Sequence, residues 1–241
     1  MQPTVASCYV SVVIPLCNEE ENLAPLLAAL DAALAAAPFY WELILVDDGS
    51  LDRTLELALA MAAHAPHMRV IALQRNYGQT AAMQAGIEHA NGDIIVTLDG
   101  DLQNDPADIA RMVAELQSRQ LDLLVGWRQQ REDHRLLRIW PSILANRLIG
   151  RLTGIRLHDY GCSLKAYRAA VIRQVRLYGE MHRFIPLWVA CQVPRQRIGE
   201  LVVSHHPRQH GRSNYGLGRG YRVLLDLLAA AFFLKFRARP G

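Results

Sequence analysis

The chain has 241 residues, of which 51% are hydrophobic and 20% are charged. This length and composition suit one large α/β domain with a substantial core and exclude a disordered chain. The formal net charge of +3 is small, and no aromatic platforms interleave with the basic residues, so nucleic acid is not expected as a partner. The four cysteines are widely spaced and form neither a CxxC pair nor a His–Cys zinc pattern, which favours a reducing compartment.

Strand-like and helix-like segments alternate through the first half of the chain. Continuous apolar, β-branched runs predict buried strands, and Leu- and Ala-rich runs at helical spacing predict helices between them. Such alternation predicts βαβ units, and hence a mostly parallel sheet flanked by helices. Asp52 and Asp105-Pro106 are typical of helix starts. In chain order, we expect strand 9–14, helix 22–37, strand 41–46, helix 51–64, strand 69–73, helix 80–90, strand 94–98, helix 106–119 and strand 121–125.

The pattern changes after Gly126. Residues 128–156 combine seven arginines with apolar residues and predict a basic amphipathic helical stretch. A turn at 161–163, a helix at 169–175, a strand at 198–203 and a polar, basic loop at 205–219 follow, and an apolar helix is expected at about 220–236. No stretch reaches the roughly 20 apolar residues that span a bilayer, and no secretory signal precedes the first strand, so the chain as given is not expected to cross a membrane.

Polar side chains follow each of the first four predicted strands. Because parallel strands place their carboxyl ends at one edge of a sheet, where α/β proteins bind ligands, these side chains should meet there. One acidic turn, such as 47–52, is equally well explained by helix capping, but four polar turns in succession indicate a ligand site. The side chains are Asn18 and Glu19 after the first strand, Asp47, Asp48 and Asp52 after the second, Asn76 and Gln79 after the third, and Asp99, Asp101 and Gln103 after the fourth.

The sequence Asp99-Gly100-Asp101 gives the most specific signal. Carboxylates two residues apart in a tight turn converge on one ion, and the intervening glycine permits close approach of the backbone. Oxygen ligands of this kind suit Mg²⁺ or Mn²⁺ that also binds a substrate diphosphate. A Rossmann dehydrogenase and a P-loop kinase are disfavoured, because neither G-x-G-x-x-G after the first strand nor G-x-x-x-x-G-K-[ST] occurs.

Taken together, these motifs resemble the inverting family 2 glycosyltransferases of GT-A fold. The set consists of P-x-x-N-E at 15–19, V-D-D-G-S-x-D at 46–52, R-N-x-G-Q at 75–79 and D-G-D-x-Q-x-D-P at 99–106. Residues 126–128, 159–165 and 208–215 resemble the dolichol-phosphate mannosyltransferase-like branch, whose bacterial members charge undecaprenyl phosphate with glucose, mannose or related sugars. The resemblance covers about residues 10–236. Two departures are Cys17, where the family often has a larger side chain, and Tyr160-Gly161-Cys162, which replaces a Ser-Gly-Phe-like turn.

The resemblance implies a role for each matching residue. Asp99, Asp101 and Arg128 are expected to be catalytic, and Asp99, Asp101 and Gln103 to hold the metal. The residues expected to bind the nucleotide-sugar are Pro15, Cys17, Asn18, Glu19, Asp47, Asp48, Gln79, Asp99, Gly100 and Asp101. The residues expected to bind the acceptor phosphate are Arg128, Arg138, Ser163, Arg208, Arg212 and Ser213, the last three on a loop that would close over the substrates.

The function that follows is metal-dependent transfer of a hexose from a UDP-glucose- or GDP-mannose-type donor to a polyprenyl phosphate. Residues 1–218 would form the catalytic domain, with a nucleotide-sugar half at about 1–126 and an acceptor half at 127–218, and residues 219–241 a juxtamembrane amphipathic helix. The protein would lie peripherally on the cytoplasmic side of the cell membrane, and a homo-oligomer is left open. The alternatives are a soluble family 2 enzyme with a hydroxyl acceptor, in which Asp101 or Asp159 would be the base, and a non-catalytic nucleotide-sugar-binding module.

Overall fold

The computed structural model describes residues 8–129, 157–177, 179 and 181–207. The predicted basic stretch at 128–156, apart from its first two residues, and the apolar helix at about 220–236 lie outside these residues. Across the described ranges, no helix has the length and apolar content needed to cross a bilayer. The elements are β1 (Tyr9–Leu16), α1 (Glu20–Leu34), β2 (Tyr40–Asp47), α2 (Thr54–Ala62), β3 (Met68–Ala72), α3 (Gln79–His89), β4 (Ile94–Thr97), α4 (Asp108–Ser118), β5 (Leu123–Trp127), β6 (Lys165–Arg168), α6 (Ala169–Ile172), η1 (Met181–Phe184), α7 (Ile185–Val189), η2 (Arg195–Arg197) and β7 (Ile198–Val202).

A seven-stranded sheet runs through the molecule in the order β3-β2-β1-β4-β6-β5-β7. Every pairing is parallel except those of β6, which lies antiparallel between β4 and β5. The expected mostly parallel α/β sheet is therefore confirmed. Strand β6 was not predicted, because four residues that begin with a lysine and end with an arginine give no apolar run. The carboxyl ends of β1, β2, β3, β4, β5 and β7 share one edge, which the amino end of β6 also reaches.

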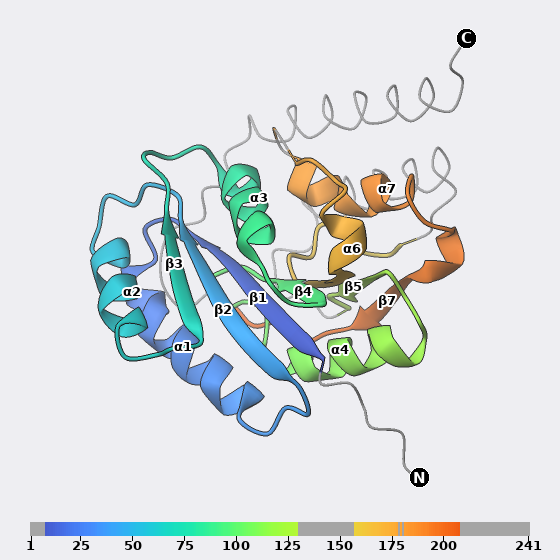
Figure 1. The fold of residues 1–241 in the computed structure, drawn as a ribbon, viewed down its shortest axis with the longest axis horizontal. Helices are drawn as coiled ribbons and strands as arrows, with labels where there is room; N and C mark the ends of the chain where they lie inside the picture. Colours follow the sequence, from blue (N-terminus) through green and yellow to red (C-terminus); the bar gives the residue numbers. More distant parts are fainter. Residues whose placement is uncertain (1–7, 130–156, 178, 180, 208–241) are drawn as a thin grey trace.

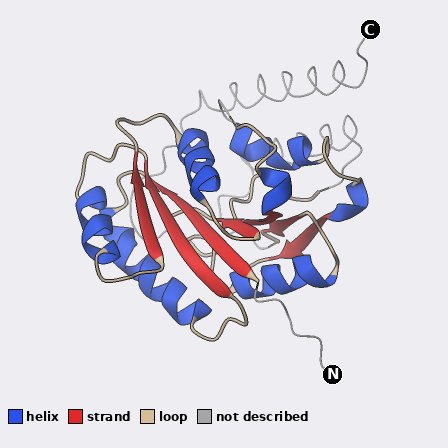
Figure 2. Cartoon of the chain, in the orientation of Figure 1, coloured by secondary structure: helices blue, strands red, loops and turns tan. Residues whose placement is uncertain are grey.

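Helices cover both faces of this sheet, as Figures 1 and 2 show. Leucines of α1 and apolar residues of α4 pack with one side of β1, β2 and β4, while α3, α6 and α7 pack on the other side. Val12 and Val13 of β1 point to opposite faces, yet both are fully buried. Burial on both faces explains why the strands form continuous apolar runs in the sequence, and it leaves the sheet edge as the place for polar residues.

The predicted helix-start signals are confirmed as local hydrogen bonds. Asp52 Oδ1 accepts the N–H of Thr54 at 3.0 Å, and Asp105 Oδ1 accepts the N–H of Ala107 at 2.9 Å. Helix α2 begins three residues later than expected. The reason is that Asp52 and Arg53 pair with the start of α1, where the Arg53 N–H donates to Glu20 and the Glu20 N–H donates to Asp52.

Glu42 is a buried carboxylate that ties β1, β2 and β3 together. It accepts hydrogen bonds from the Ser11 hydroxyl at 2.5 Å, the Asn91 N–H at 2.7 Å and the Arg69 guanidinium at 2.7 Å. Burial by itself raises the pKa of Glu42, but the hydrogen bonds from Ser11 and Asn91 and the charge of Arg69 outweigh it and hold the pKa below its ordinary value of 4.5.

Replacement Glu42→Gln should therefore lower the free energy of unfolding by about 1–3 kcal/mol at pH 7. Because the pKa of Glu42 is lower in the folded protein than in the unfolded chain, its ionised form stabilises the fold at pH values above the unfolded-state pKa. This contribution is lost as the pH falls through the folded-state pKa. Urea unfolding of wild type and Glu42→Gln at pH 7 and at steps below pH 4.5 should show the two midpoints converging. Glu115→Gln, which removes only the exposed pair with Arg119, should change the midpoint little at any pH.

Candidate active site

The loops that follow β1 and β2 hold each other in place at the carboxyl edge of the sheet. The Asn18 side-chain oxygen accepts the N–H of Leu51 at 2.7 Å, and the Ser50 hydroxyl accepts the N–H of Asn18 at 3.0 Å. Asn18 has a φ of 56°, a conformation that asparagine tolerates better than most residues. Asn18 was predicted to contact the nucleotide-sugar, but its side-chain oxygen is engaged in the hydrogen bond that joins the two loops.

Asp48 draws the loop after β3 toward the same edge. Its two carboxylate oxygens accept the N–H groups of Tyr77 at 2.7 Å and Gly78 at 2.8 Å. The backbones approach so closely that a Cβ on Gly49, whose φ is +64°, would lie 2.4 Å from the Arg75 carbonyl carbon. Burial raises the pKa of Asp48, and these two hydrogen bonds only partly oppose it. Asp48 therefore shapes the edge through the backbone of its neighbours.

Asp47 lies beside it with one oxygen unused. The residue is 1% exposed, and its Oδ2 accepts the N–H of Ser50 at 3.1 Å. Its Oδ1 is buried and has no hydrogen-bond partner among the residues that the structure describes. A buried acceptor left in this state costs about 1–3 kcal/mol, which a donor group on a ligand would recover. Burial raises the pKa of the half-buried Cys17 thiol, the charges of Asp48, Asp47 and Glu19 add to the rise, and a hydrogen bond from the Asn76 amide at 3.1 Å opposes it.

The acidic turn after β4 packs directly on the end of β1. A Cβ on Gly100 would lie 2.5 Å from Leu16 Cδ2, so a larger residue here would require the Leu16 side chain to move. Asp99 accepts the Gln79 amide at 2.6 Å, and Asp101, 4% exposed, accepts the N–H of Gln103 at 3.1 Å. Burial, and then the charge of Asp101, raise the pKa of Asp99. The two carboxylates therefore repel each other across the turn.

Two cations lie nearby, Arg128 directly after β5 and Lys165 at the start of β6. Arg128 forms a two-point ion pair with Asp159, with Nε to Oδ2 at 2.7 Å and Nη2 to Oδ1 at 3.1 Å. Burial disfavours the charged guanidinium, but Asp159 more than compensates and raises the pKa of Arg128. Lys165 is 3% exposed and donates to the Cys162 carbonyl; burial lowers its pKa. Both cations oppose the rise in the pKa of Asp99, which places them within electrostatic reach of the acidic turn.

This donor set fits a divalent cation. No group of three or more His, Cys, Asp or Glu side chains in metal-binding positions is found in the described ranges. Asp99 and Asp101 nevertheless bring two mutually repelling carboxylates to one turn, and hard oxygen ligands of this type suit Mg²⁺ or Mn²⁺. Such ions are commonly bound through one or two carboxylates, with substrate phosphates and water completing the coordination.

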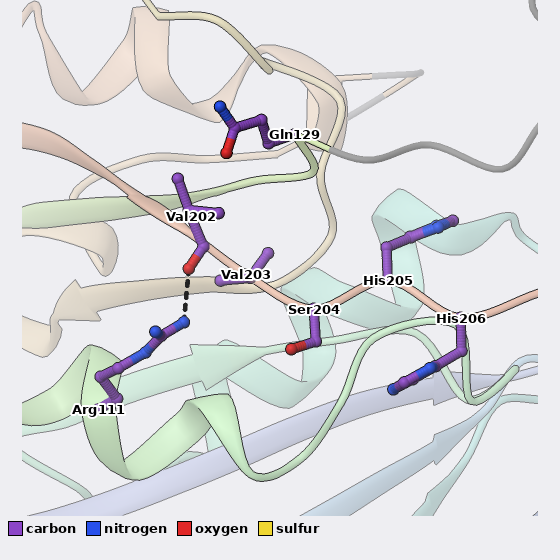
Figure 3. Close-up of a pocket in the computed structure, with 7 residues that line it drawn as sticks. All are labelled: Arg111, Gln129, Val202, Val203, Ser204, His205 and His206. Atoms are coloured by element: carbon purple, nitrogen blue, oxygen red, sulfur yellow. Dashed lines mark hydrogen bonds between the residues drawn. The ribbon is translucent and has the colours of Figure 1, made fainter.

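A pocket of about 400 Å³ is lined mainly by the end of β7 and the residues that follow it, and is drawn in Figure 3. The backbone N–H of His206 donates to the Gln103 carbonyl at 2.8 Å, and that of Ser204 donates to Asp108 at 2.7 Å, so the segment after β7 runs against residues 103–108. Arg111 on α4 donates to the Val202 carbonyl, the dashed line in the figure. Among the predicted site residues that the structure describes, none lines this pocket. Its lining is Arg111, Gln129, Val202, Val203, Ser204, His205 and His206.

All the predicted site residues that the structure describes lie at this edge, while four others lie outside the described residues. The latter are Arg138, Arg208, Arg212 and Ser213. Sequence reasoning missed the partners Asn104 and Lys165 and the pairing of Asp159 with Arg128. Asn104 accepts the Ser163 hydroxyl at 2.8 Å, so Ser163 joins the acidic turn to the segment before β6. Those at the edge are Pro15, Cys17, Asn18, Glu19, Asp47, Asp48, Gln79, Asp99, Gly100, Asp101, Gln103, Arg128 and Ser163.

A family model described as Glycosyl transferase family 2 matches residues 11–176. The chain is 58% identical over 238 residues to a dodecaprenyl-phosphate galacturonate synthase of Rhizobium johnstonii, covering 98% of this chain and 70% of that protein. It is 43% identical over 232 residues to an undecaprenyl-phosphate 4-deoxy-4-formamido-L-arabinose transferase of Edwardsiella ictaluri, covering 95% of this chain and 70% of that protein.

Solved structures show the same fold at low sequence identity. Glucosyl-3-phosphoglycerate synthase from Mycobacterium tuberculosis, in complex with Mn²⁺, uridine diphosphate and glucosyl-3-phosphoglycerate, superposes with a TM-score of 0.74 at 18% identity. That match covers 94% of this chain and 80% of the other. S. aureus TarS in complex with UDP-GlcNAc gives a TM-score of 0.64 at 17% identity, over 92% of this chain and 66% of the other. The architecture is therefore the GT-A fold.

The Arg128–Asp159 pair should be a large contributor to stability when only one partner is removed. Asp159→Asn leaves a guanidinium whose side chain is 19% exposed without its counter-charge, and we expect the free energy of unfolding to fall by about 2–4 kcal/mol. Arg128→Met combined with Asp159→Asn should recover most of that loss, because no unpaired charge remains. Urea unfolding of the single and double variants measures both values. A double variant as unstable as Asp159→Asn would contradict this electrostatic account.

Proposed function

The chain belongs to glycosyl transferase family 2 and is a glycosyltransferase, and from that premise we propose that it moves a sugar from a nucleotide-sugar to a polyprenyl phosphate. The observation that carries the proposal is the meeting of two kinds of charge at one sheet edge: the acidic turn Asp99–Asp101 and the paired guanidinium of Arg128. Carboxylates suit a metal-bound diphosphate, and a fixed arginine suits a second phosphate.

The donor nucleotide would lie over the ends of β1 and β2. The unused Oδ1 of Asp47 is a buried acceptor that an N–H of a nucleobase or a hydroxyl of a ribose would satisfy. Pro15 would line the same pocket from the end of β1, and Cys17 and Glu19 would do so from the residues that follow, because Leu16 pairs with Asp47. Asn18, Asp48 and Gln79 would support the pocket by their hydrogen bonds to Leu51, Tyr77 and Asp99.

Asp99 and Asp101, with Gln103 beside them, would hold Mg²⁺ or Mn²⁺ against the diphosphate. A bound divalent ion would neutralise charge on the departing nucleoside diphosphate. The solved relative from Mycobacterium tuberculosis contains Mn²⁺ with uridine diphosphate, which supports this assignment as an analogy of fold.

Arg128 would hold the acceptor phosphate in line with the anomeric carbon of the sugar. An oxygen of the lipid phosphate attacks that carbon while the bond from the carbon to the diphosphate oxygen breaks, and the electron pair leaves with the diphosphate. This single displacement inverts the anomeric centre. A phosphate oxygen is already ionised near neutral pH, so no general base is required. The ion pair of Asp159 with Arg128 occupies one of the two carboxylates, Asp101 and Asp159, that a hydroxyl acceptor would need as a base.

The acceptor class comes from the relatives. Proteins that are 58% and 43% identical to the chain are named for dodecaprenyl phosphate and undecaprenyl phosphate, and the chain spans 70% of the length of each. Their named sugars are galacturonate and 4-deoxy-4-formamido-L-arabinose, so we include a uronic acid donor beside the glucose and mannose donors expected from the sequence.

The protein would act peripherally on the cytoplasmic face of the membrane. Residues 1–218 would form the catalytic domain, and residues 219–241 a juxtamembrane helix. Arg138, Arg208, Arg212 and Ser213 would complete the acceptor site.

Sugar transfer in detergent tests the proposal directly. Purified protein is incubated with Mn²⁺ or Mg²⁺, undecaprenyl phosphate and, in parallel, labelled UDP-galacturonate, UDP-glucose or GDP-mannose. We expect one donor to give a lipid-linked sugar that disappears with EDTA and falls at least about 100-fold in Asp101→Asn, because loss of a metal carboxylate weakens stabilisation of the leaving group. Metal-dependent donor hydrolysis without any lipid product would rule out the polyprenyl phosphate acceptor and favour a hydroxyl acceptor.

Nucleotide binding should depend on Asp47. Asp47→Asn removes the negative charge behind the unused oxygen, and we expect the affinity for UDP in the presence of Mn²⁺ to fall about tenfold by calorimetry, which corresponds to about 1.4 kcal/mol. Asp93→Asn is the matched control, because Asp93 accepts the N–H of Tyr9 at the opposite end of β1. Equal affinities in the two variants would remove Asp47 from the nucleotide pocket.

A further inference from the structure

Glu200 on β7 holds the segment that precedes β6. Its Oε1 accepts the backbone N–H of His158 at 2.6 Å and that of Asp159 at 3.0 Å. Its Oε2 lies 2.8 Å from Nδ1 of His158. The Glu200 side chain is only 12% exposed, whereas that of its partner His158 is 65% exposed. One carboxylate thereby fixes two consecutive residues that lie in a loop rather than in a strand.

The same loop is fixed a second time by an aromatic contact. The His158 ring stacks on the Trp127 ring at a centroid distance of 4.2 Å and an interplanar angle of 15°. Trp127 is the last residue of β5, and Glu200 pairs in register with Val125 of that strand. Strands β5 and β7 therefore hold His158 from two sides, and the rigid sheet sets the position of the next residue, Asp159.

Asp159 in turn fixes the position of the Arg128 guanidinium. Its side chain is 3% exposed, and its two oxygens meet the guanidinium at 2.7 and 3.1 Å. The N–H of Gly161 also donates to Asp159, at 3.1 Å. Two-point contact fixes the plane of a guanidinium as well as its position. A displacement of the Asp159 backbone would therefore move the Arg128 fork.

We propose that Glu200 is a positioning residue for the acceptor phosphate, acting through the backbone of residues 158–159 and the Asp159 carboxylate on Arg128. The inference rests on the proposed function, because it takes Arg128 to bind that phosphate. Glu200 itself touches neither substrate. Both backbone N–H groups meet the same oxygen, so the action depends on a hydrogen-bond acceptor at that place and not on the negative charge of the carboxylate.

This dependence on one oxygen separates two variants of Glu200. Glu200→Gln keeps an oxygen that accepts both backbone N–H groups, and its amide group can donate to His158 Nδ1 when that nitrogen carries no proton. Glu200→Ala removes every acceptor. Misplacement of a binding group by about 1 Å costs on the order of 10–100-fold.

The test measures transfer to undecaprenyl phosphate with the full chain, together with amide hydrogen exchange. For Glu200→Ala, the KM for the lipid phosphate should rise about 10–100-fold, the KM for the nucleotide-sugar should stay within about twofold, and the amides of residues 158 and 159 should exchange faster. Glu200→Gln should keep all three values within about threefold of wild type. Glu115→Ala, which removes an exposed glutamate of α4, should match wild type.

Three results would overturn the proposal. The first is an unchanged acceptor KM in Glu200→Ala, the second is a parallel rise of both KM values, and the third is equal impairment of Glu200→Gln and Glu200→Ala, which would indicate an effect of charge. If Glu200→Ala does not fold, Glu200→Asp, which is one methylene too short to reach both N–H groups, replaces it.

Failure of the proposed function gives a different result, because wild-type protein would then make no lipid-linked sugar. The link from Glu200 to Arg128 is then measured by the Nε–H nuclear magnetic resonance signal of Arg128, assigned by its loss in Arg128→Lys. A shift or broadening of that signal in Glu200→Ala, but not in Glu200→Gln, would support the positioning role. An unchanged signal would refute it.

Discussion

The carboxylates of Asp99 and Asp101 after β4 repel each other, and two cations, Arg128 directly after β5 and Lys165 at the start of β6, offset that repulsion. The pKa of Asp99 reflects both effects, because burial and the charge of Asp101 raise it while the charges of Lys165 and Arg128 oppose the rise. The sheet favours this arrangement, because helices cover both of its faces and the loops at its carboxyl edge bring polar side chains together. Crowded charge at one edge is unfavourable for folding but is suited to a ligand that carries both a metal ion and phosphates.

The two halves of the edge are organised by different means. Over β1 and β2, the carboxylates and amides bond to backbone N–H groups of the next loop, so that three loops form one surface around the unused oxygen of Asp47. Over β5 and β6, the order comes from a buried ion pair and the loop that carries its acid. The first arrangement creates a rigid pocket and the second a rigid cation. A rigid pocket and a rigid cation match the two substrates proposed here, because the nucleotide must be enclosed and the lipid phosphate must be oriented toward the sugar.

The pairing of Asp159 with Arg128 also bears on the chemistry. A glycosyltransferase with a hydroxyl acceptor needs a carboxylate that can take a proton, and Asp159 is occupied by a guanidinium. An acceptor that is already an anion needs only alignment and a stabilised leaving group. The relatives named for polyprenyl phosphates agree with this distinction, and Glu200 extends the alignment one step further from the substrate, into β7.

The sequence by itself determined the alternation of strands and helices, the mostly parallel sheet and the four polar strand ends, because burial on both faces leaves continuous apolar runs and because parallel strands bring their carboxyl ends together. Through the resemblance to family 2 glycosyltransferases, it also predicted that Asp99, Asp101 and Arg128 belong to one site. Only the tertiary structure decided that β6 inserts antiparallel between β4 and β5, that Asp159 pairs with Arg128, that Asn18 and Asp48 bond to loops rather than stand free, and that Glu200 fixes residues 158–159. These contacts join residues about 30 to 40 positions apart through side-chain geometry, and neither periodicity nor spacing records which donor faces which acceptor.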